Sequence, residues 1–200
     1  MVVVLALSAL ARAALGGVYA VPSGSMEPAL RPGDRVVVRQ LWGAPVRRGD
    51  VVVFDGTGSF DPSVPSGALV SAWRSLAGRL GLPGAPRDYV KRVVGLPGDR
   101  VTCCAAGGAL EVDGRPLAEP YLAPGTAPSR LRFDVVVPPG RLWVMGDARD
   151  TSADSRDHLG DPGGGTVPRG RVVGRVVAVA WPPGRTALLD AQDHAPGRTP

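Results

Sequence analysis

Lysine is almost absent from this chain of 200 residues: of its 23 basic residues, only Lys91 is a lysine. Cysteine and histidine are nearly as rare, with two of each, and aromatic residues make up 5% of the chain. So few cysteines exclude a disulfide-rich small domain. With so few aromatic residues, the core must consist mainly of valine, leucine and alanine.

The single lysine is a candidate for chemistry that arginine cannot perform. Arginine stays protonated at any biological pH, whereas a lysine in an apolar environment can lose its proton near neutrality and act as a base. Lys91 is followed by arginine and flanked by the apolar residues Tyr89, Val90, Val93 and Val94. The alternative is an ordinary surface lysine.

Neither the cysteines nor the histidines form a recognisable site. Cys103 and Cys104 are adjacent, which permits an internal disulfide only with severe strain, so we expect free buried thiols or an intermolecular bridge. They are too few for a structural zinc site. His158 lies in an Asp-rich loop without a nucleophile motif beside it, which favours an exposed loop residue, and His194 lies near the C-terminus.

The net charge of +5 is spread along the chain without a basic block. It therefore does not indicate nucleic acid, and anionic lipid is at least as good a partner. Residues 1–22 support lipid, since they are apolar apart from Ser8 and Arg12. A membrane span needs about 20 apolar residues. We interpret residues 1–20 as the outer part of a membrane anchor that begins upstream; a secretory signal or a buried element is the alternative.

From Gly24 onward, short valine-rich runs alternate with Gly, Pro and Asp turn signals, a pattern typical of an antiparallel β sandwich or barrel. Asp113-Gly114 is a good hairpin turn. The expected strands are 36–38, 51–54, 89–94, 110–112, 135–137, 142–145 and 172–181. Residues 68–80 instead have the spacing of an amphipathic helix, which packs on the core or lies on a membrane surface. Residues 183–200 are rich in Pro and Gly and are expected to form a flexible tail.

The segment Pro22-Ser-Gly-Ser-Met-Glu-Pro-Ala-Leu30 is the second candidate for chemistry. Its glycine allows close backbone approach, and a serine in such a turn presents its hydroxyl and its own N–H together. With a neutral, buried Lys91, this segment would supply a Ser–Lys dyad.

Four segments in this order resemble the bacterial type I signal peptidases, membrane-bound serine proteases that remove signal peptides from secreted proteins. They are the segment just described, Arg48–Phe54, Tyr89–Asp99, and Gly146–Arg156 with Gly160. The resemblance implies an all-β fold, in which an antiparallel catalytic core carries a smaller inserted β domain and follows an N-terminal membrane anchor. It assigns residues 21–182 to the catalytic domain, 57–87 to an insertion and about 105–140 to the smaller β unit.

The resemblance also implies a role for each site residue. Ser25 would be the nucleophile and Lys91 the general base, with the Ser25 N–H and the Ser23 hydroxyl as the oxyanion hole. Ser152 would hydrogen-bond to the Lys91 amine and orient it. Ion pairs among four residues would support the site: Asp147, Asp154, Arg92 and Arg156. Shallow apolar pockets for the small substrate residues at −1 and −3 would be lined by Val21, Pro22, Met26, Leu30, Tyr89 and Val90.

The implied activity is cleavage of exported preproteins after an Ala-x-Ala-type site, with the catalytic domain on the extracytoplasmic side of the cell membrane. The substrate would add as an extended strand beside residues 20–23 and 88–90. We expect no metal or other cofactor, no nucleic acid, and a monomer whose partners are signal peptides and membrane lipid. A pilin-type processing peptidase and an inactive partner in secretion are the alternatives. A repressor of the LexA type is disfavoured, because 22 apolar residues cannot form a DNA-binding domain.

The chain departs from the family pattern in its last segment. The family usually has Asn where this chain has Ala148 and Thr151, and aromatic residues where it has Asp157 and His158. Because these side chains support the loop rather than react, we expect a looser loop with activity retained.

Overall fold

The computed structural model describes residues 17–41, 43–61, 88–105 and 108–189. Over these residues the chain is all-β apart from two short 3₁₀ helices, η1 (Arg169–Arg171) and η2 (Pro183–Arg185). Within this part of the chain, no helix has the length and apolar character of a membrane span. Every strand pair is antiparallel, which confirms the predicted fold class.

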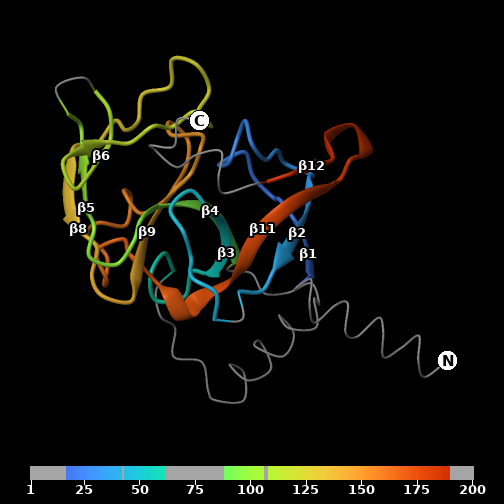
Figure 1. Cartoon of the computed structure of the whole chain (residues 1–200), viewed down its shortest axis with the longest axis horizontal. Coiled ribbons are helices and arrows are strands. Elements are labelled where there is room, and N and C mark those ends of the chain that lie inside the picture. Colours follow the sequence, from blue (N-terminus) through green and yellow to red (C-terminus); the bar gives the residue numbers. More distant parts are fainter. Residues whose placement is uncertain (1–16, 42, 62–87, 106–107, 190–200) are drawn as a thin grey trace, which may run out of the picture.

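Eight strands form a large sheet, and a second sheet lies at one end of it (Figure 1). The order in the large sheet is β1 (Gly17–Ala20), β2 (Arg35–Arg39), β11 (Val172–Trp181), β3 (Val51–Asp55), β4 (Asp88–Gly95), β9 (Arg141–Met145) and β10 (Val167–Pro168), with β12 (Ala187–Leu188) paired to β11. The second sheet has the order β7 (Arg115–Pro116), β6 (Glu111–Val112), β5 (Arg100–Cys103) and β8 (Phe133–Val136). It therefore begins at Arg100, ahead of the boundary at 105 expected for the smaller unit.

Three turns with the same Gly-Asp sequence lead into strands of both sheets. Their glycines, Gly33, Gly49 and Gly98, have φ of +89°, +89° and +92°, values that glycine adopts without strain. In each turn the aspartate carboxylate accepts a hydrogen bond from the N–H three residues earlier. The turn signals read from the sequence are therefore present, and each one fixes the start of the next strand.

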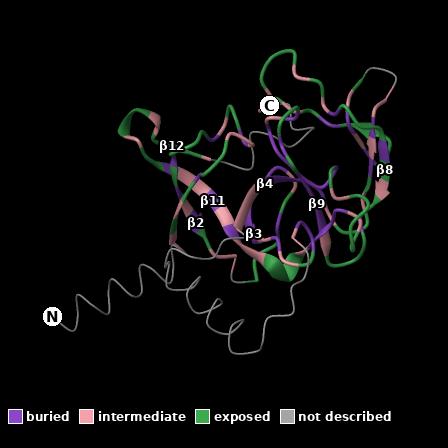
Figure 2. Cartoon of the chain, turned by 180° about the vertical axis from the view of Figure 1, so that it is seen from behind, coloured by how far each residue is buried: buried purple, intermediate pink, exposed green. Residues whose placement is uncertain are grey.

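Valine supplies most of the core, as the composition requires. Val51 and Val53 of β3 pack in one apolar cluster, while Val52 and Phe54 pack in another, so both faces of this strand are buried. A third cluster joins the sheets, because Val94 and Trp143 of the large sheet pack against Val101, Leu110 and Phe133. β9 lies in the buried centre of the molecule (Figure 2).

Both ends of the described chain differ from the prediction. Gly17–Ala20 pairs with β2, so the last four residues of the range expected for the anchor belong to the sheet. The predicted start of the flexible tail, at residue 183, is too early in the chain. β12 pairs with β11, and Arg185 forms an ion pair with the buried Asp34 at 3.0 Å. Residues 1–16, the predicted helix at 68–80 and the end of the tail lie outside the described residues.

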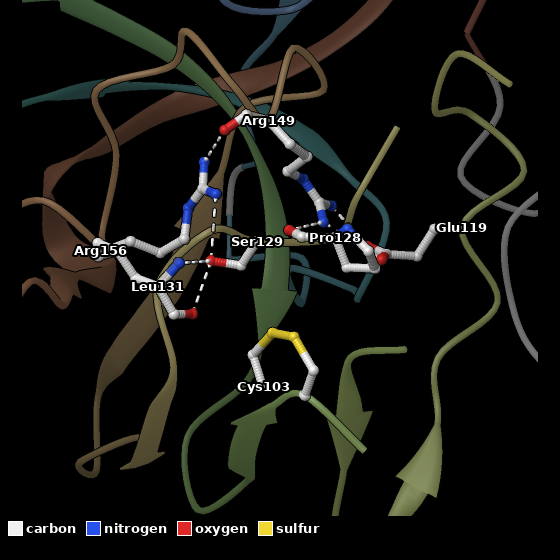
Figure 3. The surroundings of a disulfide bond; sticks show 8 residues. Cys103, Glu119, Pro128, Ser129, Leu131, Arg149 and Arg156 are labelled. Carbon is white, nitrogen blue, oxygen red and sulfur yellow. Dashed lines mark hydrogen bonds and ion pairs between the residues drawn. A yellow bond between two sulfur atoms is a disulfide. The ribbon is translucent and has the colours of Figure 1, made fainter. Parts of the chain in front are cut away.

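The fate predicted for the cysteines is wrong, since Cys103 and Cys104 form a disulfide with each other at the end of β5 (Figure 3). The two residues are joined by a cis peptide, and their Cα atoms are 2.9 Å apart.

Candidate active site

Ser25 lies in the turn that follows β1. The N–H of Glu27 donates to the carbonyl oxygen of Gly24 at 3.0 Å, and the N–H of Leu30 donates to Met26 at 2.9 Å. The side chains of Met26 and Leu30 are buried among valines of β2, β3 and β11. Because these apolar residues fix the turn to the sheet, Ser25 is carried on a rigid support.

The six residues expected to line substrate pockets fall into two groups. Val21, Met26 and Leu30 are 3%, 1% and 0% exposed, so they form the core beneath the turn rather than a surface open to substrate. Their apolar character reflects packing, which a sequence pattern does not distinguish from pocket lining. The other three, Pro22, Tyr89 and Val90, are exposed or half-buried.

Lys91 lies on β4, where its side chain is buried and its Nζ is 2.7 Å from Ser25 Oγ. Burial disfavours the charged ammonium and lowers the pKa of Lys91 from 10.5 to about 8. A substantial fraction of the amine is therefore neutral at mildly alkaline pH. A neutral amine at this distance is able to accept the proton of the Ser25 hydroxyl.

The charges around Lys91 limit how far burial lowers its pKa. The carboxylates of Asp154, Asp147 and Asp157 raise the pKa, whereas the guanidinium of Arg156 lowers it. For Asp154 itself, burial alone would raise the pKa, but the hydrogen bonds from Arg156 and Gly146 and the charge of Arg156 together outweigh burial and lower the pKa. Asp154 thus remains ionised beside Lys91.

Two buried ion pairs support the site from neighbouring elements. Arg92 on β4 binds Asp147 through two hydrogen bonds, of 2.8 and 2.7 Å. Arg156 binds Asp154 in the same two-point manner, at 2.8 Å for both bonds. All four side chains are at most 5% exposed. Side chains alternate along a strand, so Arg92 reaches Asp147 while Lys91, its neighbour on β4, reaches Ser25.

Gly146 begins the loop after β9 and is held by hydrogen bonds to both of its backbone polar groups. Its N–H donates to Asp154 at 2.9 Å, and its carbonyl oxygen accepts from Arg149 at 2.8 Å. A Cβ at this position would lie 2.4 Å from the backbone oxygen of Ser25 and 2.1 Å from Ser152 Oγ. Only glycine lets this loop approach the nucleophile turn so closely.

The predicted hydrogen bond from Ser152 to the Lys91 amine is not present in the structure. Ser152 is buried beside Gly146 and Ser25, but its hydroxyl has no hydrogen-bond partner within the described residues. Ser152 therefore lies in the site without contacting the lysine in the way predicted.

Ser23 is close to Ser25, since its hydroxyl lies 3.4 Å from Ser25 Oγ. The structure therefore groups Ser23, Ser25, Lys91 and Ser152 around the turn after β1. Among the described residues, no three His, Cys, Asp or Glu side chains are grouped as metal ligands would be.

Comparison with known proteins places this chain in a family. The family model described as "Signal peptidase, peptidase S26" matches residues 1–181. The chain is 39% identical over 207 aligned positions to signal peptidase I of Mycobacterium tuberculosis, with 90% of this chain and 70% of that protein covered. It is 33% identical to signal peptidase I of Bacillus caldolyticus, covering 82% and 79%.

The chain belongs to the S26 signal peptidase family. This membership, with a buried lysine against a serine, makes it an enzyme of the signal peptidase I type, a serine endopeptidase. A signal peptidase I structure from Enterococcus faecalis aligns with 66% of this chain and 97% of its own, at 22% identity and a TM-score of 0.43.

Sequence reasoning missed one buried residue of this S26 peptidase site, Arg149. Its side chain is fully buried and pairs with Glu119, which lies 30 residues earlier in the chain. Tyr121 donates to the same carboxylate and places its ring against Arg92. The sequence offered one signal, the presence of an arginine within the segment Gly146–Arg156. Nothing in the sequence indicates that its partner lies 30 residues earlier.

His158 was expected to be an exposed residue of a looser loop. Its ring instead stacks on Phe60 with centroids 4.3 Å apart, and Phe60 in turn contacts Phe54 and Tyr89. Its Nδ1 lies 2.6 Å from Asp161. In this S26 peptidase, His158 therefore packs against an aromatic cluster of the structure.

Proposed function

We propose that this chain removes signal peptides from exported preproteins, as a membrane-bound serine endopeptidase that cuts after an Ala-x-Ala-type site. The observation that carries the proposal is the distance of 2.7 Å between Lys91 Nζ and Ser25 Oγ. The burial that brings the pKa of this lysine to about 8 supplies a base suited to an unactivated serine.

In the first step, the neutral Lys91 amine accepts the Ser25 proton as Oγ attacks the carbonyl carbon of the last alanine. The Ser25 N–H and the Ser23 hydroxyl stabilise the resulting oxyanion. The Lys91 ammonium then gives its proton to the leaving amine, and the peptide C–N bond breaks. The products are an acyl ester on Ser25, a free amino terminus on the mature protein and a neutral lysine.

In the second step, water attacks the ester while Lys91 accepts a proton from it. The ester bond breaks, and the lysine returns the proton to Ser25 Oγ, which restores the starting state. The same residue thus acts as base and acid in each half of the reaction. Asp154, Asp147 and their arginine partners hold the lysine environment fixed throughout.

The substrate strand is proposed to bind between residues 20–23 and 88–90. β4 pairs with β3 from Asp88 to Arg92, but it pairs with β9 only from Arg92 onward. An extended peptide beside this part of β4 would add a strand to the sheet through main-chain hydrogen bonds. Burial and then the Asp88 carboxylate raise the pKa of Tyr19, consistent with β1 lying near the start of β4.

Preference for small residues follows from the limited room above the core. Pro22, Tyr89 and Val90 are proposed to contact the residues at −1 and −3, above a floor of packed side chains formed by Val21, Met26 and Leu30. Large substrate side chains would have to displace that floor, at a cost typical of overpacking.

We further propose that the apolar N-terminal segment anchors the enzyme, with the catalytic domain on the extracytoplasmic side. The support is the apolar run of residues 1–11 and its position ahead of β1, which leads directly into the nucleophile turn. An anchor there would hold the site beside the membrane, where signal peptides lie. The net positive charge favours anionic lipid at that surface.

The test is cleavage of a preprotein with an Ala-x-Ala site in detergent. Ser25→Ala is the informative variant, and Glu27→Gln, an exposed change on the same turn, is the matched control. We expect the wild type and the control to cut after the final alanine and Ser25→Ala to lose cutting. Cutting elsewhere, or equal cutting by Ser25→Ala, would contradict the proposal.

A further inference from the structure

Residues 117–131 connect β7 to β8 and lie against the catalytic loop after β9. They contact three arginines of the site: Tyr121 contacts Arg92, Glu119 and Pro128 contact Arg149, and Ser129 contacts Arg156. Figure 3 shows the last two of these arginines side by side, each facing this segment. The segment thus borders the charged residues that surround Lys91.

Arg149 joins the 117–131 segment to the loop after β9. Its side chain is fully buried, and its guanidinium is shared between the two sides. On one side Nε donates to the carbonyl oxygen of Gly146; on the other, the remaining nitrogens donate to both oxygens of Glu119 and to the carbonyl oxygen of Pro128. A buried guanidinium keeps this position only while all its hydrogen-bond partners are present.

Tyr121 connects the same carboxylate to the neighbour of the catalytic lysine. Its hydroxyl donates to Glu119 at 2.7 Å, and its ring lies under the Arg92 guanidinium, 4.0 Å from the Cζ atom to the ring centroid. Burial and then Glu119 raise the pKa of Tyr121, so the phenol remains a donor at all working pH values. A desolvated guanidinium over an aromatic face is held electrostatically by the ring.

We infer that Glu119 and Tyr121 are positioning residues of the peptidase: through Arg92 and Arg149 they fix the Asp147 carboxylate and the Gly146 carbonyl group beside the Ser25–Lys91 pair. The inference rests on the proposed function of that pair. It gives the second sheet a catalytic purpose, because the segment that reaches the site is the connection between two of its strands.

The Tyr121 ring affects Lys91 through the Arg92–Asp147 ion pair. Without the ring, water reaches the Arg92–Asp147 pair, and the guanidinium is free to leave the carboxylate. The negative charge of Asp147 is then less neutralised by Arg92, and it favours the ammonium form of Lys91. The other charged groups that act on Lys91, which are Asp154, Asp157 and Arg156, belong to the loop after β9 and keep their own contacts.

The experiment measures kcat, KM and the pH dependence of kcat/KM on an Ala-x-Ala peptide, with the full chain in detergent. In Tyr121→Ala we expect kcat to fall on the order of tenfold or more with KM changed far less, since the reacting groups are displaced rather than the substrate. We expect the acidic limb of the pH profile to move to higher pH. Tyr121→Phe keeps the ring and should retain most of the activity and the wild-type profile.

Arg130→Ala is the matched control on the same segment, because it removes an exposed ion pair to Asp150. It should leave kcat, KM and the profile unchanged. A folded Tyr121→Ala with wild-type kcat and profile would overturn the inference. If Tyr121→Ala does not fold, Tyr121→Leu, which keeps the apolar cover but not the ring, replaces it: a loss of kcat relative to Tyr121→Phe supports the inference, and equality overturns it.

Failure of the proposed function has a different outcome. In that case the wild-type chain itself would not cut the peptide, or Ser25→Ala would cut it equally well. If the wild type cleaves the peptide with Ser25 as its nucleophile and Tyr121→Ala is indistinguishable from it, only the role of the 117–131 segment is rejected.

Discussion

The backbone N–H of Ala148 donates a hydrogen bond to the carbonyl oxygen of Ser25 at 3.1 Å, which ties the nucleophile turn to the loop after β9. The same carbonyl oxygen would lie 2.4 Å from a Cβ on Gly146. The position of Ser25 is therefore determined by a loop far from it in sequence, and by the absence of a side chain in that loop.

Gly146→Ala should displace the nucleophile, because the backbone oxygen in its way cannot rotate aside. We expect kcat/KM to fall by about 10²-fold, as for a displacement of roughly 1 Å at a reacting group. Steady-state kinetics on an Ala-x-Ala peptide provides the measurement. Gly160→Ala, which meets nothing within 4 Å, is the matched control and should behave as wild type. Equal kinetics for the two variants would show that the turn tolerates the shift.

Lys91→Arg should keep the positive charge and abolish cleavage, because a guanidinium does not lose its proton. The expected loss is about 10²–10⁴-fold, the usual contribution of a general base. The rates of Lys91→Arg, Ser25→Ala and the double variant should be similar, since residues that act as a unit are not additive. Substantial activity in Lys91→Arg would remove the lysine from the mechanism.

Activity should increase with pH through the pKa of Lys91, about 8, since only the neutral amine accepts the serine proton. Below this value log kcat/KM should increase by about one unit per pH unit, and above it the profile should level off. The measurement is kcat/KM across mildly acidic to alkaline pH at constant ionic strength. A flat profile over that range would contradict the assignment of the base.

Stability should depend on the same group, with the sign set by its lowered pKa. Between pH 8 and 10.5 the unfolded chain holds the Lys91 proton and the folded chain does not, so stability increases with pH in this window. Below it, the buried ammonium costs about 3 kcal/mol. Lys91→Met should therefore be more stable than wild type at neutral pH, by an amount that shrinks as pH approaches 10.5. Urea unfolding of both proteins at several pH values tests this, and a constant difference would refute it.

Asp147→Asn should destabilise the fold by about 3–5 kcal/mol, because it leaves the buried Arg92 guanidinium without a counter-charge. Asp134→Asn breaks an ion pair of similar geometry with Arg100, but one whose partners are 51% and 61% exposed. That control should leave stability close to that of the wild type, because solvent screens an exposed pair. Comparable losses from both variants, measured by urea unfolding, would mean that burial does not determine the strength of these pairs.

The strands were largely predictable because each valine-rich run is bounded by a Gly or Pro turn. The Gly-Asp turns at Gly33, Gly49 and Gly98 adopt the positive φ that glycine permits, and the hairpin at Asp113-Gly114 forms between β6 and β7. The exceptions are short strands that form by pairing with another strand. β12 pairs with β11, and β1 pairs with β2.

The pairing of groups within the site was less predictable. Ser152 was expected to hydrogen-bond to Lys91 and has no hydrogen-bond partner in the described structure. Met26 and Leu30 were expected to line substrate pockets, and they pack in the core. In both cases the residue type was informative but its direction was not, since direction depends on how loops pack against the sheet. The disulfide of Cys103 and Cys104 depended on a local backbone geometry that the sequence does not reveal.

The sequence by itself determined the candidates for the proposed chemistry: a single lysine in an apolar run and a serine in a small-residue turn are a candidate base and a candidate nucleophile, because those properties belong to the side chains. Only the tertiary structure decided that the two atoms lie 2.7 Å apart across 66 residues of chain, and that Glu119 and Tyr121 reach the same site. Side-chain chemistry is encoded residue by residue. Proximity arises only when antiparallel pairing and burial bring distant segments of the chain together.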